Sequence, residues 1–327
     1  MIRKTLPLAV ALTAIAAATT VPVASAAPTL KAGVVDGTLR ISGGPFAEQI
    51  TLRLSALDRN QLQVDVGNDG SADQTFDLST FRAIDVEAGN GNDTVRIDEV
   101  NGAFTTTKPT RIDGENGNDT LLGAGGAEVF YGGNGDDFVD GNAGADTAFL
   151  GRGDDVFVWD PGDASDIVEG QSGSDTMVFN GSVGDEIMSA TAVGGRVSFT
   201  RNLGNIVMNL DDVEGIDVRA LGGTDAVTVN DMGGTDVARV DVDLAGALGG
   251  STADGKADTV TVAATKGDDL IAVDANGAAV EVSGLAAFVR ITHADAASDT
   301  LIIDTDAGAD NVTLDPALAG LIQVSVK

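Results

Sequence analysis

A pattern of glycine and aspartate with a nine-residue period runs through the middle of the chain and limits the folds that it can adopt. In the stretch YGGNGDDFVDGNAGADTAFLGRGDD, which ends at Asp155, three carboxylates follow one another at nine-residue intervals: Asp137, Asp146 and Asp155. Each of them has a glycine two positions earlier. Seven such units fill residues 114–178, and an insertion of two residues, Trp159-Asp160, interrupts the count before the sixth unit.

Each unit consists of a glycine-rich turn followed by a short strand. Such a unit cannot bury an apolar face alone, whereas two units make one layer of a coil, with a strand on each side. The eighth position, which is never charged, would then point inward. These residues are Leu121, Phe130, Val139, Ala148, Phe157, Val168 and Met177. We therefore predict an all-β protein in which these units stack into a coil.

The sixth position of each unit carries a carboxylate, and units two apart fall on the same edge of the coil. This arrangement predicts one row of Asp119, Asp137, Asp155 and Asp175 and another of Glu128, Asp146 and Asp166. Neighbours in a row would lie about 4.8 Å apart, the ordinary strand spacing. Two charges at that distance repel by about 0.9 kcal/mol in water and by about 3.5 kcal/mol at an effective dielectric constant of 20. A hard divalent cation between the turns would remove this repulsion, and an all-oxygen shell suits Ca²⁺ better than Mg²⁺.

The unit GGNGDDFVD at residues 132–140 resembles the GGxGxDxUx nonapeptide of RTX, or haemolysin-type, calcium-binding repeats. The stretch 159–182 and the flanks more loosely resemble secreted bacterial calcium-binding proteins. The resemblance implies a parallel β-roll that binds several Ca²⁺ ions at its turns. It implies side-chain ligands at Asp119, Asp137, Asp146, Asp155, Asp166 and Asp175, and carbonyl ligands at turn residues such as Gly117, Gly135, Gly144 and Gly153.

The chain departs from the repeat pattern at several positions. Glu128 has a longer side chain than aspartate, Leu150 replaces the first glycine of its unit, and Pro161 and Ala164 disturb the sixth turn. We therefore expect the best cation sites between Asp119 and Asp137 and between Asp137 and Asp155, with poorer sites beside Glu128 and Asp166.

Residues 1–26 have the pattern of a secretory signal peptide. Arg3 and Lys4 precede an apolar run, and Ala24-Ser25-Ala26 is a small-residue cleavage site. A short membrane anchor is the alternative, but no stop-transfer pattern follows and no later stretch is apolar enough to span a bilayer. We expect a Sec-type signal, cleavage after Ala26 and an extracellular protein. RTX proteins commonly carry a C-terminal secretion signal instead, so this route departs from the resemblance.

Three further segments follow the predicted signal peptide. Residues 27–112 alternate apolar and polar positions in short runs, which is typical of half-buried strands. Residues 113–180 contain the predicted β-roll. Residues 181–327 repeat a turn, an aspartate and an alternating strand, but the tight G-x-G turn is missing. We interpret this last segment as a degenerate β-solenoid of strands without metal sites.

The charge of the chain favours cations as partners. The net charge is −31, and residues 1–26 contain two basic and no acidic residues, so it becomes −33 after cleavage. Such a field repels nucleic acid and anionic lipid. The chain has no cysteine and therefore no disulfide, so a bound metal is the usual alternative that could stabilise the fold of an exported protein. Disorder is the alternative for an acidic, glycine-rich chain, but 43% of the residues are apolar.

Two weaker signals have ordinary structural interpretations. The stretch 65–73 places Asp65, Asp69 and Asp73 around a glycine and loosely resembles an EF-hand loop, but Phe76 occupies the position of the last glutamate. We expect a plain turn, with a stray Ca²⁺ site as the alternative. Trp159 is expected in the core or in a cap; an exposed residue that stacks on sugars is the alternative.

Two other signals concern titratable residues. His293 is the only histidine, and without cysteine or another nitrogen donor it cannot build a zinc site. We expect no catalytic role for it, and the sequence contains neither a G-x-S-x-G elbow nor an HExxH motif. Adjacent acidic pairs such as Asp211-Asp212 would point to opposite faces of a strand. We expect such pairs to be solvated or bound to calcium and not to form a glycosidase pair.

These observations favour a secreted, non-enzymatic Ca²⁺-binding protein that coils where Ca²⁺ is abundant. A structural or adhesive role at the cell surface or in a matrix is compatible with it, and an unpaired terminal strand could join a second copy. The partner is unknown. The alternative is a polysaccharide-active β-helix enzyme of the lyase or epimerase type. A site for acidic sugars needs a basic cleft, however, and the 19 Lys and Arg residues are spread thinly along the sequence.

Overall fold

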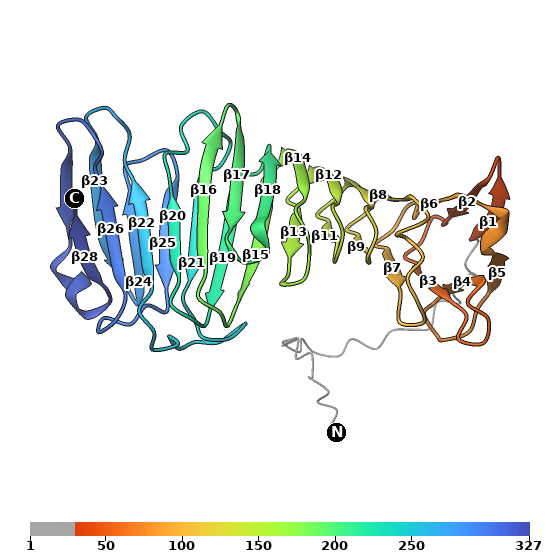
Figure 1. The fold of residues 1–327 in the computed structure, drawn as a ribbon. Helices are drawn as coiled ribbons and strands as arrows, with labels where there is room; N and C mark the ends of the chain where they lie inside the picture. The colour runs from red at the N-terminus through yellow and green to blue at the C-terminus, as the bar shows by residue number, and fades with distance from the viewer. Residues whose placement is uncertain (1–29) are drawn as a thin grey trace, which may run out of the picture.

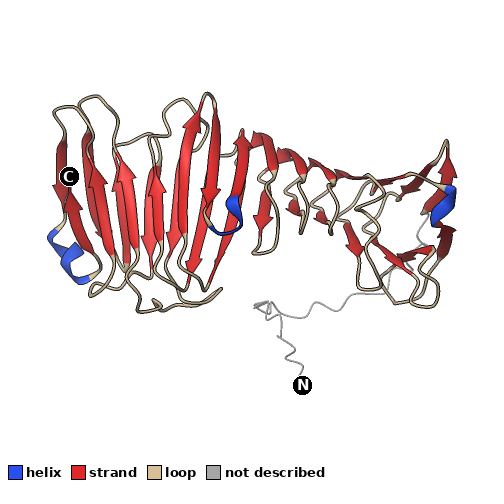
Figure 2. Cartoon of the chain, viewed as in Figure 1, coloured by secondary structure: helices blue, strands red, loops and turns tan. Residues whose placement is uncertain are grey.

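A computed structural model of the chain describes residues 30–327, so the predicted signal peptide lies outside the described residues. The described part is an elongated solenoid of two long sheets that face each other (Figure 1). Figure 2 shows that strands dominate, with three short 3₁₀ helices: η1 (Leu78–Thr80), η2 (Leu203–Asn205) and η3 (Pro316–Gly320). The prediction of an all-β fold is confirmed. No helix within residues 30–327 has the length and apolar character needed to span a membrane.

Sheet 1 contains fourteen strands. In order across the sheet they are β1 (Lys31–Val35), β2 (Thr38–Ser42), β6 (Ala83–Glu87), β8 (Thr110–Asn116), β10 (Val129–Asn134), β12 (Thr147–Gly153), β14 (Ile167–Gly173), β18 (Ile206–Asp211), β17 (Arg196–Arg201), β16 (Ile187–Val193), β20 (Ala226–Val229), β22 (Thr259–Ala263), β26 (Thr300–Asp304) and β28 (Gln323–Val326).

Sheet 2 also contains fourteen strands. In order they are β27 (Asn311–Leu314), β23 (Leu270–Asn276), β24 (Ala279–Ser283), β25 (Phe288–Thr292), β21 (Arg239–Asp243), β19 (Gly215–Leu221), β15 (Thr176–Ser182), β13 (Val156–Trp159), β11 (Phe138–Asp140), β9 (Thr120–Leu122), β7 (Thr94–Asp98), β3 (Gln49–Leu54), β4 (Gln61–Val66) and β5 (Gln74–Asp77).

The nine-residue units build the narrow middle of the solenoid (Figure 1). Successive units alternate between the sheets, so β9, β11, β13 and β15 pair in parallel in sheet 2, and β8, β10, β12 and β14 pair in parallel in sheet 1. All seven eighth-position residues are at most 1% exposed and fill the space between the sheets. The predicted parallel β-roll with an inward eighth position is therefore confirmed.

The flanking segments differ from a purely parallel coil. Antiparallel meanders occur at β3-β4-β5, at β16-β17-β18 and at β23-β24-β25. Two-residue turns that begin with Gly194 or Gly277 connect the first two strands of the second and third meanders, and both glycines have a positive φ. Such a turn matches the twist of a hairpin and reverses the chain inside the sheet. The sequence analysis predicted strands here but not these reversals.

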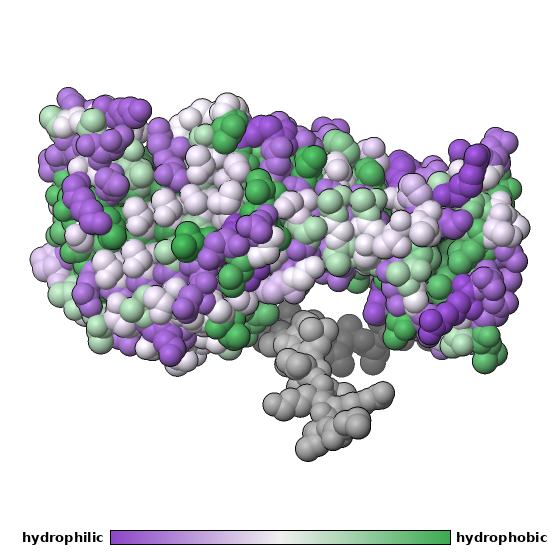
Figure 3. All heavy atoms as spheres, in the orientation of Figure 1, coloured by the Kyte–Doolittle hydropathy of each residue, from purple (hydrophilic) through white to green (hydrophobic). Residues whose placement is uncertain are grey.

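Both sheets continue through the whole described chain. Residue 112 lies within β8 and residue 180 lies within β15, so the flanks and the β-roll share their sheets and their apolar core. On the face shown in Figure 3, hydrophilic and hydrophobic residues are interspersed over the wide and the narrow parts.

An aromatic stack marks the junction where the β-roll widens into the C-terminal part. Trp159 is fully buried, as expected for a core residue, and its ring lies 4.1 Å from that of Phe179. Next to this stack, Arg201 forms an ion pair with Glu186, and their side chains are 7% and 0% exposed. The guanidinium carbon of Arg201 also lies 5.2 Å from the centre of the Trp159 ring. The junction thus contains a buried charge pair inside an apolar core.

We expect Arg201→Met to lower the free energy of unfolding by about 3–5 kcal/mol, because it leaves the Glu186 carboxylate buried without its counter-charge. The matched control is Arg196→Met, which removes a partly exposed arginine from ion pairs with Glu169 and Asp211 and should cost at most about 1 kcal/mol. Urea unfolding followed by far-UV circular dichroism in excess Ca²⁺ measures both. Equal losses in the two variants would contradict the role given to the buried pair.

Candidate metal centre

The carboxylates at the turns form the two predicted rows, and backbone hydrogen bonds hold each row together. In the first row, along sheet 2, the N–H of Asp119 donates to Asp137 Oδ1 at 2.7 Å. The N–H of Asp137 donates in turn to Asp155 Oδ1 at 2.7 Å, and that of Asp155 to Asp175 Oδ1 at 2.9 Å. The row extends beyond the prediction, through Asp93, Glu48 and Glu214 at its ends.

The second row follows sheet 1. The N–H of Glu128 donates to Asp146 Oδ1 at 2.7 Å, and the N–H of Asp146 donates to Asp166 Oδ1 at 2.8 Å. After β18 and β17 the same pattern resumes in the C-terminal part. Its members there are Glu186, Asp225, Asp258 and Asp299. The sequence analysis noted the turn and aspartate pattern of this part but assigned it to strands, because the G-x-G turn is missing.

The second oxygen of most of these carboxylates is buried without a hydrogen-bond partner. This is true of Oδ2 of Asp93, Asp119, Asp137, Asp146, Asp155, Asp175 and Asp225, and of Oε1 of Glu128. Each of these residues is at most 2% exposed. A buried polar atom without a partner is costly, and an ionised one more so. A bound cation is the kind of group that would satisfy a whole row of such oxygens.

Glycines at the first position of a unit leave space beside these oxygens. A Cβ atom added to Gly114 would lie 2.4 Å from Asp119 Oδ2 and 2.5 Å from the carbonyl oxygen of Gly132. A Cβ atom added to Gly132 would lie 2.6 Å from Asp137 Oδ2. A carboxylate oxygen and a carbonyl oxygen from successive layers therefore face the same small space. This donor set consists only of oxygen, and it fits Ca²⁺.

The fourth-position glycines of each row stack directly over one another, Gly117, Gly135 and Gly153 in the first row and Gly126 and Gly144 in the second. Gly117, Gly135, Gly144 and Gly153 all have φ between 125° and 146°, a region that favours glycine. A Cβ atom on Gly135 would lie 2.1 Å from the Gly117 oxygen, and one on Gly153 would lie 2.0 Å from the Gly135 oxygen. These carbonyl groups point at the turn of the next layer. Their role as Ca²⁺ ligands stays a prediction.

Burial perturbs the acidity of both rows. Loss of solvent raises the pKa of Asp119 to about 6, of Asp137 and Asp175 to about 7 and of Asp146 to about 9. The charges of neighbouring carboxylates raise these pKa values further, whereas the backbone hydrogen bonds lower them. At neutral pH the metal-free rows are thus partly protonated, and Asp146 most of all.

The second row is irregular at both ends. At Asp166, which shares its turn with Pro161, burial raises the pKa to about 7, and the nearby charges of Asp163 and Asp140 add to the effect. At the other end, Glu128 Oε2 accepts a hydrogen bond from the N–H of Ala124 at 3.0 Å, while Oε1 has no partner. Both ends differ from the regular turns of the first row.

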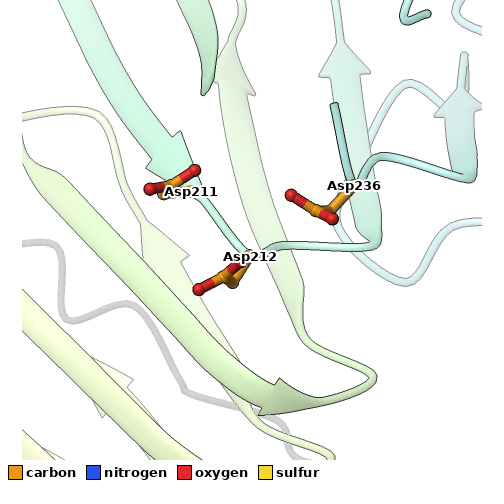
Figure 4. Close-up of side chains that lie close together, drawn as sticks. All are labelled: Asp211, Asp212 and Asp236. Atoms are coloured by element: carbon orange, nitrogen blue, oxygen red, sulfur yellow. The ribbon is translucent and has the colours of Figure 1, made fainter. Parts of the chain in front are cut away.

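A separate acidic group lies where β18 ends. Carboxylate oxygens of Asp211, Asp212 and Asp236 lie within 4.8 Å of one another, and Figure 4 shows the three side chains gathered beside the turn. The expectation that Asp211 and Asp212 point to opposite faces is wrong here, because Asp212 follows the end of the strand with φ of 50°. Asp211 already pairs with Arg196, so this exposed group differs from the buried rows.

The weaker signals at residues 65–73 and 293 have protein partners. Asp65 is buried, pairs with Arg53 at 2.7 Å and accepts the N–H of Gly70 at 3.0 Å. The segment is therefore the turn of the β4-β5 hairpin, as expected. His293 Nδ1 lies 2.6 Å from Asp243 Oδ1 on the outer side of sheet 2.

Comparison with known families gives one result for this chain. The model of the RTX calcium-binding nonapeptide repeat matches residues 111–127 and 122–157, with four copies. The match covers the narrow middle of the solenoid, where the two rows of unpartnered oxygens lie side by side. No curated protein matches the chain.

The metal-free protein should become more stable as the pH falls from about 8 to about 5. A carboxyl group with a raised pKa binds more protons in the folded than in the unfolded chain, so acidification favours folding until the ordinary pKa of about 4 is reached. In saturating Ca²⁺ the trend should reverse, because a cation requires ionised carboxylates. Thermal unfolding in chelator and in Ca²⁺ at both pH values checks this; stability that rises with pH in chelator would contradict it.

Proposed function

We propose that this chain, whose residues 111–157 carry RTX calcium-binding nonapeptide repeats, is a secreted and non-enzymatic protein that Ca²⁺ folds and stabilises. The observation that carries the proposal is the row of buried, unpartnered oxygens from Asp119 to Asp175. Several ions bind between successive turns, with Asp119, Asp137, Asp146, Asp155, Asp166 and Asp175 as side-chain ligands. Carbonyl groups of the turns complete the oxygen shells.

The energetics of the rows support coupling between binding and folding. Without a cation, each turn must either keep a buried charge without a partner or take up a proton. At neutral pH both cost free energy relative to the unfolded chain, in which the carboxylate is ionised and hydrated. Ca²⁺ supplies positive charge and accepts several oxygen ligands at once. In the unfolded chain these oxygens are not brought together, so the free energy of binding adds to the free energy of folding.

Export is the second part of the proposal. The signal-like residues 1–26 support passage through a membrane as an unfolded chain. Extracellular modules bind Ca²⁺ at about 10⁻⁴–10⁻³ M, so the β-roll would stay unfolded inside the cell and coil outside. Location then decides when the protein folds.

A structural or adhesive role at a surface or in a matrix is the third part. The solenoid is elongated, and each end presents the last strands of both sheets: β1 and β5 at one end, β27 and β28 at the other. Such edges can pair with another chain. A second copy or a matrix component is therefore the kind of partner that we propose.

One observation favours the alternative of an enzyme that acts on polysaccharide. A hollow of about 280 Å³ on the outer side of sheet 2 gathers Arg219, Arg239 and Arg290 beside Asp217 and Asp241. The basic residues that are scattered in the sequence thus meet on three neighbouring strands. Turnover of an acidic or neutral polysaccharide with Ca²⁺ present would support this alternative, whereas an inactive protein across such a screen would support the non-enzymatic proposal.

Titration of the chelated chain from Ala27 with Ca²⁺ tests the main proposal. We expect a cooperative gain of far-UV β signal, together with a change in the fluorescence of Trp159, the only tryptophan, as its indole becomes buried at the junction. Mg²⁺ should not reproduce these changes, because it retains its waters. A complete β signal in chelator that Ca²⁺ leaves unchanged would mean that the apolar core alone holds the coil.

The double variant Asp137→Ala and Asp155→Ala is the control for the position of the ions. It removes two neighbouring carboxylates from the centre of the first row and should lower the number of bound Ca²⁺ ions. Asp69→Ala and Asp73→Ala, in the β4-β5 turn, remove the same charge and should leave that number unchanged. Unchanged binding in the central double variant would overturn the assignment of the turns.

A further inference from the structure

The second row of carboxylates begins at Glu128, where no earlier nine-residue unit provides a turn to stack on. The loop of residues 99–109, which connects β7 to β8, takes that place. It contains neither a G-x-G turn nor a match to the repeat model. The first turn of this row is therefore covered by a segment of a different kind.

The loop is firmly built around Glu99. Its Oε1 atom accepts hydrogen bonds from the N–H of Phe104 at 2.6 Å, the N–H of Thr105 at 2.9 Å and the Thr105 hydroxyl at 3.0 Å. Phe104 is 1% exposed and packs into the core. Lys108 Nζ donates to the carbonyl oxygens of Leu78 at 2.9 Å and Phe81 at 2.7 Å. The position of Glu99 is thus fixed, and its Oε2 atom is left for another partner.

Three oxygen atoms surround the adjacent glycines of the first turn. A Cβ atom on Gly126 would lie 2.4 Å from Glu128 Oε1 and 2.7 Å from the Thr105 carbonyl oxygen. A Cβ atom on Gly125 would lie 3.0 Å from Glu99 Oε2. Glu128 is 1% exposed, and its Oε1 atom has no hydrogen-bond partner. A buried carboxylate oxygen therefore points into a space that only glycine leaves free.

The space opens to solvent. Glu99, Gly125, Asp98, Asp140 and Asp163 help to line a hollow of about 740 Å³ that runs along this edge of the roll. Water can reach the site from the hollow, and water supplies the ligands that a cation does not obtain from protein. Arg96 also lines the hollow, but it forms no ion pair with either glutamate in the described part of the chain.

We propose that Glu99, Glu128 and the Thr105 carbonyl bind one Ca²⁺ ion at a capping site outside the repeats. Two carboxylates and a carbonyl form an all-oxygen set for a hard divalent cation, and water completes the shell. The site ties the 99–109 loop, and with it the buried Phe104, to the first turn of the second row. It rests on the proposed function, because it assumes that the turns themselves take up Ca²⁺.

Counting bound Ca²⁺ by equilibrium dialysis of the full mature chain tests this site. Glu99→Gln should bind one ion fewer than the unsubstituted chain, and because glutamine keeps the Oε1 acceptor, the hydrogen bonds of the loop can persist. Asp98→Asn is the matched control: it removes the same charge from the neighbouring residue, whose Oδ1 atom accepts the N–H of Val100 at 3.0 Å. The control should bind the full number of ions.

Hydrogen exchange of residues 99–107 provides a local second readout. Ca²⁺ should slow exchange at Phe104 and Thr105 in the unsubstituted chain and in Asp98→Asn, but not in Glu99→Gln. Gly125→Ala, whose methyl group would crowd Glu99 Oε2, should behave like Glu99→Gln. If Glu99→Gln binds the full number of ions, the capping site alone is overturned. The same follows if Ca²⁺ leaves hydrogen exchange in this loop unchanged but slows it at the turn of Asp137. An unsubstituted chain that binds no Ca²⁺ overturns the proposed function as well.

Discussion

The stability of the stacked layers depends on which group faces the second carboxylate oxygen at each turn. Within each row, the first oxygen of a carboxylate accepts the N–H of the previous layer, so the carboxylates are drawn into the turns and away from water. In the β-roll the second oxygen meets only glycine and carbonyl groups. The same feature that stacks the layers therefore creates a need for positive charge at most turns of the β-roll.

Several turns of the C-terminal part meet the same need with groups of the chain itself, whereas Oδ2 of Asp225 stays buried without a partner. At Glu186 the guanidinium of Arg201 provides the positive charge. At Asp299 the second oxygen accepts the N–H of Asp295 at 2.7 Å, and at Asp269 it accepts the N–H of Thr265 at 2.9 Å. These turns do not require a cation. Buried carboxylate oxygens without a partner are thus most frequent in the narrow middle of the solenoid, where no positively charged side chain faces them.

The sequence predicts the β-roll well because its determinants are local. A period of nine residues, a glycine turn and an uncharged eighth position specify the layers, the two rows and the inward residues without knowledge of any distant contact. Asp93 and Asp225 belong to the same rows, but alanine (Ala88 and Ala220) replaces the glycine that a regular unit has five residues before its carboxylate. The motif is therefore weaker at these two turns, although their geometry is the same. The reversals at Gly194 and Gly277 show the limit of pattern analysis: strand alternation is the same in parallel and antiparallel sheets.

The pieces that sequence analysis misses depend on long-range contacts. Arg201 neutralises Glu186 across a meander, and Glu99 reaches the turn at Gly125 from a loop with no motif of its own. Both sit at the ends of regular stacks, where a repeat has no neighbour to pair with and a non-repeating segment must supply the missing partner. A repeating sequence specifies the interior of a solenoid, whereas its ends are specified by unique residues. Under the proposed function, the repeats set how many cations the roll holds, and the unique residues at the ends of the stacks decide where the metal-dependent section starts and stops.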